Sequence, residues 1–355
     1  MTRRAVHVAM IAVAWALLLP SLGMAQQADD VGALSAQIGR LYGEGKYAEA
    51  IPLAQSLLSS REKSFGPDHP AVATALNNLA ELYREQGRYA EAEPFYKRSM
   101  AIKETDQGRA PVSLAISLNN LSLLYQAQGL YAEAEPLNKR SLSIVENALG
   151  ADNPIIAQVL SNLATLYNIQ GRYAEAEPLH KRALSIREKA LGPDHPDVGE
   201  SLNNLGLLYF FKGDYAKAGP ILLRSTLVVE KSFGPDHPRL GTLLGNIAEL
   251  YRSQRRFAEA EPLYKRALSI KEKALGPEHE EVAKVVQNLA ILYVDQGRYI
   301  EADPLFERAL AVHEKALGPD HPDVAKSINN ITMLYFLQGR YDGETERLLK
   351  RSLSI

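Results

Sequence analysis

The histidines are the first residues in this sequence whose spacing suggests chemistry. Imidazole is a common metal ligand and an acid–base group near neutral pH. Five of the eight histidines recur at multiples of 42 residues in a Pro-Asp-His-Pro loop, which is Pro-Glu-His in one copy. They are His69, His195, His237, His279 and His321. Because each copy lies in a different repeat, we do not expect several of them to meet at one metal ion. We predict that they cap helices or brace loops.

Other reactive residue types form no recognisable catalytic set. The chain contains no cysteine, which excludes disulfides, thiolate metal sites and a cysteine nucleophile. It has no glycine-rich phosphate loop, and no serine, histidine and aspartate stand in a distinctive context. A net charge of −2 provides no basic surface for nucleic acid. We expect a protein that is not an enzyme, needs no cofactor or metal, and binds no nucleic acid.

Asparagine also recurs in a way that suggests a function. One asparagine repeats every 42 residues, as Asn78, Asn120, Asn162, Asn204, Asn246, Asn288 and Asn330. A carboxamide both donates and accepts, so a row of them can pair with a peptide backbone whatever its side chains. The preceding position holds Asn77, Asn119, Asn203 and Asn329, but Ser161, Gly245 and Gln287 in other copies. In the alternative interpretation, each asparagine bonds its own helix or the neighbouring repeat and touches no ligand. Both interpretations stay open at this point.

The elements that position these residues follow from the same period. One tyrosine position recurs as Tyr47, Tyr89, Tyr131, Tyr173, Tyr215, Phe257, Tyr299 and Tyr341, and a second as Tyr83, Tyr125, Tyr167, Tyr209, Tyr251, Tyr293 and Tyr335. A fixed period of this length indicates stacked repeats. In residues 160–186 the apolar residues have helical spacing on both sides of Gly171, which provides a helix stop. Residues 192–196 then separate one unit from the next, so each unit is predicted to be an antiparallel helix pair.

Two further periodic features support this prediction. Alanine at one position allows two helix backbones to approach closely; its copies are Ala50, Ala92, Ala134, Ala176, Ala218, Ala260 and Ala302. Acid-first pairs four residues apart are expected on the solvated face, each contributing a few tenths of a kcal/mol. These pairs are Glu93–Lys97, Glu135–Lys139, Glu177–Lys181 and Glu261–Lys265.

The repeat resembles the tetratricopeptide repeat. Leu163-Ala164, Tyr167, Gly171, Tyr173, Ala176 and Ala183-Leu184 match its consensus. The length of 42 residues, with Asn-Asn-Leu and Leu-Gly-Pro-Asp-His-Pro, resembles the kinesin light chain class of these repeats. The resemblance implies an all-α fold, a right-handed α-α superhelix of about eight helix-turn-helix repeats spanning residues 26–355. It also implies that the first helices line a concave groove that holds extended peptides, with the recurring asparagine facing the groove.

We expect specificity to lie at positions of this face that vary between copies. One turn after Asn204 come Leu207, Phe210 and Phe211, where the second unit has Glu81, Arg84 and Glu85. The charged copies suggest that these positions tolerate solvent, so the two phenylalanines are a candidate exposed patch. Ordinary packing between repeats is the alternative. The predicted peptide-binding residues are Asn78, Asn119, Asn120, Asn162, Asn203, Asn204, Leu207, Phe210, Phe211, Asn246, Asn288 and Asn330. The groove is expected to be apolar in its middle and charged near its amino end.

The amino end has the plan of a bacterial secretory signal. Arg3 and Arg4 precede an apolar run over residues 5–19, and Gly23-Met24-Ala25 supplies the small residues of a cleavage site. We predict a signal peptide over residues 1–25 and an exported mature chain, periplasmic or secreted, with no membrane span after cleavage. An uncleaved anchor formed by residues 5–25 is the alternative, although about 15 apolar residues are short for a bilayer.

These observations predict a scaffold that binds a protein or peptide partner, as an extended peptide or a partner helix. The alternative function is a self-associating structural or envelope-assembly component. The sequence stops at Ile355 inside the final predicted helix, so the self-association would use the carboxyl-terminal end.

Overall fold

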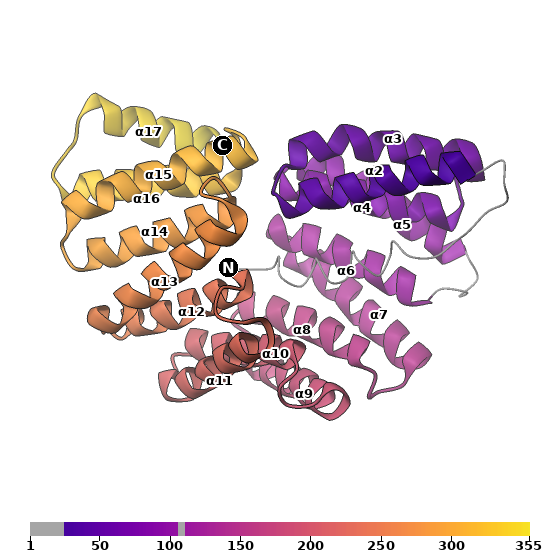
Figure 1. Cartoon of the computed structure of the whole chain (residues 1–355), viewed down its shortest axis with the longest axis horizontal. Helices are drawn as coiled ribbons and strands as arrows, with labels where there is room; N and C mark the ends of the chain where they lie inside the picture. The colour runs from indigo at the N-terminus through magenta and orange to yellow at the C-terminus, as the bar shows by residue number, and fades with distance from the viewer. Residues whose placement is uncertain (1–24, 106–110) are drawn as a thin grey trace. The chain divides into compact units, whose positions relative to one another are not determined.

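Pairs of antiparallel helices make up the part of the chain that this computed structural model describes, residues 25–105 and 111–355. Helices and short turns account for all of it, with no strand in those ranges, so the expected all-α repeat fold is confirmed. Each repeat consists of a first and a second helix. In chain order the helices are α2 (Ala25–Gly43), α3 (Tyr47–Phe65), α4 (Pro70–Glu85), α5 (Tyr89–Thr105), α6 (Pro111–Ala127), α7 (Tyr131–Leu149), α8 (Pro154–Ile169), α9 (Tyr173–Leu191), α10 (Pro196–Phe211), α11 (Tyr215–Phe233), α12 (Pro238–Ser253), α13 (Phe257–Leu275), α14 (Glu280–Asp295), α15 (Tyr299–Leu317), α16 (Pro322–Leu337) and α17 (Gly343–Ser354) (Figure 1).

The chain divides into two compact units, residues 1–186 and 187–355, with the boundary inside α9. In each unit a helix packs on the helix before it and the helix after it, as α5 packs on α4 and α6 in the first unit and α13 on α12 and α14 in the second. The predicted leader lies outside the described residues, except for Ala25, which begins α2. Within the described ranges, no helix combines the length and apolarity needed to cross a membrane.

The recurring histidines begin the first helices. The Nδ1 atom of His69 accepts a hydrogen bond from the backbone N–H of Ala71 at 3.1 Å, which satisfies one of the unpaired donors at a helix start. His195, His237, His279 and His321 make the same bond at 3.0–3.2 Å. Asn153 does so in the fourth repeat through its side-chain oxygen, at 3.0 Å. The predicted capping role is therefore confirmed.

Most of the turns between the two helices of a repeat require a left-handed residue. Gly213 and Gly297 occupy this position with φ of 78° and 74°, a conformation that glycine adopts without steric cost. In the sixth repeat the position is Arg255, with φ of 59°, and it is the only non-glycine residue of positive φ among the described residues. This turn is therefore strained relative to the others.

The helices of a repeat approach one another through the recurring alanine. All seven copies, from Ala50 to Ala302, are fully buried, as the sequence predicts. The four acid-first pairs also form, with N–O distances of 2.7–2.8 Å. Each lysine of these pairs stays largely exposed to solvent.

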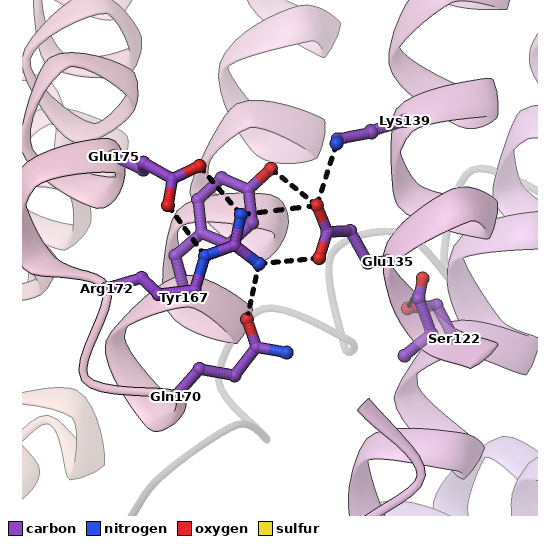
Figure 2. A network of polar contacts seen from close by, with 8 residues as sticks. Ser122, Glu135, Lys139, Tyr167, Gln170, Arg172 and Glu175 are labelled. Atoms are coloured by element: carbon purple, nitrogen blue, oxygen red, sulfur yellow. Dashed lines mark hydrogen bonds and ion pairs between the residues drawn. The ribbon is translucent and has the colours of Figure 1, made fainter. Parts of the chain in front are cut away.

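A polar cluster joins the third repeat to the fourth (Figure 2). Glu135 of α7 accepts from the Tyr167 hydroxyl at 3.1 Å and from Nη1 of Arg172 at 2.6 Å, and it pairs with Lys139 at 2.7 Å. The Arg172 guanidinium lies 4.1 Å from the centre of the Tyr167 ring, a cation–π contact. Arg172 and then Lys139 lower the pKa of Glu135 to about 2. Glu261, Tyr293 and Arg298 repeat the arrangement in the second unit.

A second series of contacts, which the sequence analysis did not anticipate, links the second helices. A glutamate near the end of one second helix pairs with an arginine of the next, 36 residues later in all but the last case. The pairs are Glu62–Arg98, Glu104–Arg140, Glu146–Arg182, Glu188–Arg224, Glu230–Arg266, Glu272–Arg308 and Glu314–Arg351, at 2.5–2.7 Å. Each exposed ion pair contributes only about 0–1 kcal/mol to stability. Together, the pairs fix how each second helix is aligned along the next one.

The strained turn gives a direct test. Arg255→Gly is expected to stabilise the protein by about 1 kcal/mol, because a left-handed residue with a Cβ costs about 1–2 kcal/mol. Urea unfolding followed by circular dichroism measures the change. As a matched control, Gly297→Ala puts a Cβ into the same turn of the next repeat, where no atom lies within 4 Å of it. It should destabilise by a similar amount, and an unstable Arg255→Gly variant would contradict the argument.

Candidate functional site

The predicted asparagines lie at one register of the first helices α4, α6, α8, α10, α12, α14 and α16. Asn120 and Asn246 are buried, with 8% and 7% of their surface exposed. Asn78, Asn162, Asn204, Asn288 and Asn330 are half-buried. The seven copies therefore share a position in their helices but not an equal access to solvent.

Three of these asparagines bond the neighbouring repeat. The Nδ2 atom of Asn120 donates to Oδ1 of Asn77 at 3.2 Å. Asn162 donates in the same way to Asn119 at 2.6 Å, and Asn246 to Asn203 at 2.7 Å. Each bond joins consecutive first helices across 43 residues, and we call these three bonds the asparagine ladder. A hydrogen bond of this kind contributes about 1 kcal/mol net.

Each ladder bond needs an acceptor in the preceding repeat. That acceptor is the residue immediately before the recurring asparagine of that repeat, as Asn119 is for Asn162. Wherever that residue is asparagine and a further repeat follows, the bond forms. In the second unit, the acceptor positions for Asn288 and Asn330 are occupied by Gly245 and Gln287. Within the described residues, Asn78, Asn204, Asn288 and Asn330 make no side-chain hydrogen bond. The ladder thus separates two groups of asparagine that the sequence analysis treated as one.

In the second repeat, the positions equivalent to Leu207, Phe210 and Phe211 carry charged residues, and these residues are largely buried. Glu81 and Glu85 expose only 4% and 5% of their surfaces, and both pair with Arg84 between them. The hydroxyl of Tyr96 on α5 donates to Glu81 at 2.6 Å, and burial raises the pKa of Tyr96 well above its usual value. The expectation that charged copies mark solvent-tolerant positions is therefore wrong. Buried charges persist here because each has an opposite charge in contact.

The second unit contains a related cluster whose charged side chains are only half-buried. Glu249 pairs with Arg252 at 2.6 Å and accepts from the hydroxyl of Tyr264 at 2.8 Å. Arg252 also reaches Asp295 of the next first helix. Burial raises the pKa of Tyr264. The variable positions thus face partly into their own hairpin, where the glutamate accepts a hydrogen bond from a tyrosine hydroxyl of the second helix in both repeats.

The fourth repeat fills the same register with neutral polar residues. Nδ2 of Asn168 lies 3.1 Å from Nε2 of His180, while Nδ1 of His180 is buried without a hydrogen-bond partner. Burial lowers the pKa of His180 to about 4, so the ring is neutral at pH 7. In the third repeat Asn138 occupies the histidine position, and both of its buried amide atoms also lack a partner.

The predicted apolar patch lies at the end of α10. Phe211 is 53% exposed, whereas Leu207 and Phe210 are half-buried. The two phenylalanine rings meet edge to face at 5.3 Å, and Phe210 also contacts the ring of Tyr215 on α11 at 5.8 Å. Phe210 therefore takes part in packing its own hairpin, and Phe211 presents its ring to solvent. Ligand contact at these residues stays a prediction.

A row of basic side-chain types at the joints between repeats was not predicted from the sequence. Lys103 donates to the Ser117 hydroxyl at 2.8 Å, Arg187 to Ser201 at 3.0 Å, and Nδ1 of His313 lies 2.8 Å from the Ser327 hydroxyl. The spacing of 14 residues recurs in register with the repeat, which is the signal that identifies it. Each serine is buried, so the row anchors the next first helix. Within the described ranges, no group of histidine and acidic side chains is arranged to hold a metal ion.

The comparisons agree with this architecture. The family model of the tetratricopeptide repeat matches residues 32–105, 113–189, 156–225, 201–273, 240–304 and 280–355. None of the curated proteins matches the chain.

Solved structures are similar over much of the chain. BtubC (BKLC) from P. vanneervenii is 25% identical, with a TM-score of 0.52 over 63% of this chain and 90% of that one. The nearly identical TPR-like repeats of a putative kinesin light chain from Podosopora anserina are 26% identical over 58% of this chain and 98% of that one, with a TM-score of 0.47. The apo quorum sensor NprR from B. thuringiensis is 15% identical, covers 91% of this chain and 86% of its own length, and has a TM-score of 0.60. This last likeness concerns the fold alone.

The buried histidine predicts a defined pH dependence. His180 has a folded pKa of about 4 against an ordinary value of 6.5, so the unfolded chain binds more protons between these values. Its contribution is complete above pH 6.5 and is lost as the pH falls towards 4. One pKa unit corresponds to about 1.4 kcal/mol, so the loss is about 3 kcal/mol.

Two substitutions at this position isolate the effect. His180→Leu introduces the residue that the next repeat carries there, Leu222, and His180→Asn introduces that of the preceding repeat, Asn138. Both should flatten the dependence of urea-unfolding free energy on pH between 7 and 4 relative to the native chain. A slope unchanged in both variants would exclude titration of His180 as its source.

Proposed function

Because this chain belongs to the tetratricopeptide repeat family, we propose that it is a non-enzymatic scaffold for protein–protein interaction. Its first helices carry the binding face, and the partner is an extended peptide or a helix of another protein. No cofactor takes part in this function.

One observation carries the proposal: polar side chains able to bond a backbone recur at one register of successive first helices, and some of them have no partner. Asn288 and Asn330 are half-buried and make no side-chain bond among the described residues. A carboxamide offers a donor and an acceptor together, which matches the paired groups of an extended peptide. The constant asparagine supplies affinity for the backbone, and the varying residues around it supply selectivity.

Selectivity for apolar side chains is expected at the fifth repeat. Leu207 and Phe210 are half-buried and Phe211 is 53% exposed, which offers aromatic surface at the end of a first helix. Aromatic anchors dominate many protein interfaces because they bury a large area with few rotatable bonds. A partner with an apolar residue at this point would cover the exposed ring.

The binding test uses random dodecapeptides displayed on phage, selected on the full chain and remeasured as synthetic peptides by fluorescence anisotropy. Phe210→Ala with Phe211→Ala is expected to weaken a selected peptide about tenfold or more, as for an aromatic hot spot. The matched control is Leu223→Ala with Leu227→Ala, which removes apolar surface that is 46% and 66% exposed on the second helix of the same repeat. Equal effects of the two double variants, with helicity intact, would contradict the patch as a binding site.

We also propose that the scaffold is exported from a bacterial cell. The support is the order of charged, apolar and small residues over positions 1–25. Expression of the full chain in a bacterium should yield a mature protein that begins at Gln26, read by mass spectrometry of the envelope fraction. A chain that keeps residues 5–25 and stays with the membrane would support the anchor instead.

A further inference from the structure

Six first helices in the described part of the chain begin with a side chain that accepts a backbone N–H, and five of these side chains are histidines. An imidazole accepts a hydrogen bond only while it is neutral, because both nitrogens of the protonated ring are donors. A positive charge is also unfavourable at the positive end of a helix. Protonation of such a cap therefore removes a hydrogen bond and adds a repulsive charge.

The five histidine caps differ in the residue whose backbone N–H they accept. That residue, two positions after the histidine, is Ala71, Asp197, Arg239, Glu281 or Asp323. An acidic side chain there attracts a protonated ring, and Oδ2 of Asp197 lies 3.8 Å from Nδ1 of His195. Glu281 interacts electrostatically with His279. Asp323 interacts in the same way with His321. Among the described histidine caps, His237 is thus the one followed by a cation.

Two cations act on the His237 ring. Its Nδ1 atom accepts the backbone N–H of Arg239 at 3.2 Å, and the charge of the Arg239 side chain opposes protonation of the ring. Lys271 of α13 opposes it as well. On α11, Phe233 stacks against the ring with centres 4.3 Å apart. The Arg239 guanidinium lies 5.4 Å from the centre of the same phenylalanine ring, so the aromatic face already has a permanent cation beside it.

The acidic groups near this cap are paired with other cations. Asp236, which precedes His237, pairs with Lys273 of α13 at 2.5 Å. Glu281 of α14 pairs with Lys271. These carboxylates are therefore already compensated, and a proton on His237 gains little from them.

We propose that His237 is an acid-sensitive cap, whose protonation releases the start of α12 and loosens the joint between the fifth and sixth repeats. The caps followed by an acidic residue keep their joints, because an ion pair then replaces the lost hydrogen bond. This device is independent of what the scaffold binds.

The direction of the pH dependence follows from the surroundings of the ring. Burial, then Arg239 and then Lys271 lower the pKa of His237 from its ordinary value of 6.5. The unfolded chain therefore binds this proton at a higher pH than the folded chain does. The stabilising contribution of the cap is complete above pH 6.5 and is lost as the pH falls through the folded pKa.

Hydrogen–deuterium exchange of the full chain, read by mass spectrometry at pH 7 and pH 5, tests the proposal locally. Protection is expressed relative to an unstructured peptide at the same pH, so that the pH dependence of the exchange reaction cancels. Residues 238–246 at the start of α12 should lose about fivefold or more of their protection at pH 5, as for the loss of a helix cap. Residues 196–204, whose cap His195 is followed by Asp197, should change by less than about twofold.

Three variants identify the groups responsible. His237→Asn introduces the residue type that caps α8, where Asn153 accepts through its side-chain oxygen, and should keep the protection at both pH values because a carboxamide does not titrate. Arg239→Asp gives His237 the acid that follows His195, and should reduce the loss to within about twofold. Arg239→Lys retains the charge and should retain the loss. Tm at pH 7 checks that each variant is folded.

Three results would overturn the proposal. The first is equal protection of residues 238–246 in the native chain at pH 7 and pH 5. The second is an undiminished loss in His237→Asn, since another group would then be its source. The third is the native loss in Arg239→Asp, or an equal loss at the start of α10, since the residue two positions after the histidine would then not govern the response.

Discussion

The register between neighbouring repeats is the constraint on which the rest of this structure depends. A helix hairpin of this size cannot bury its apolar faces alone, so each one is stable only against its neighbours. The chain enforces a single way of stacking through contacts of fixed sequence separation. The glutamate–arginine pairs between second helices span 36 residues at nearly every joint, as in Glu146–Arg182, and the asparagine ladder spans 43 between first helices. Each contact is modest in energy, but a slip of one residue would break all of them together.

Within this register the repeats differ mainly where a first helix faces its own second helix. The second repeat buries an ionic cluster there, around Arg84, and the sixth repeat has a half-buried one around Arg252. The fourth repeat buries Asn168 against His180, and the fifth places Phe210 beside its neighbouring rings. Variation at a surface position is commonly taken as a sign of ligand selectivity. In this protein, part of the variation between repeats reflects side-chain pairing inside each hairpin, because a buried charge requires a partner of opposite charge. The positions that remain for a ligand are therefore fewer than the variable positions.

The recurring asparagine of the first helices also differs between repeats in its hydrogen bonds. A carboxamide that donates to the neighbouring repeat strengthens the stack, and one without a partner does not, although each bonded copy keeps a second N–H. The residue one place earlier in the preceding repeat decides whether the bond forms: Asn77, Asn119 and Asn203 accept it, and Gly245 and Gln287 do not. A stack built from nearly identical units can thus bond some of its joints through this asparagine and leave others without the bond by changing a single side chain.

The sequence alone determined the period, the helix pairs, the capping histidines and the close-packed alanines. These features depend on local spacing, on φ preferences and on residue size, all of which can be read along one chain. The structure decided which side chains meet inside each hairpin and across the joints between repeats. Glu81 and Glu85 looked solvent-tolerant because charge usually marks a surface, yet Arg84 and Tyr96 enclose them. The difference between Asn162, which bonds the neighbouring repeat, and Asn288, which makes no side-chain hydrogen bond within the described residues, was also hidden, since both stand at the same point of the repeat. Whether a polar group has a partner depends on a residue some 40 positions away, and only the folded chain brings the two within hydrogen-bond distance.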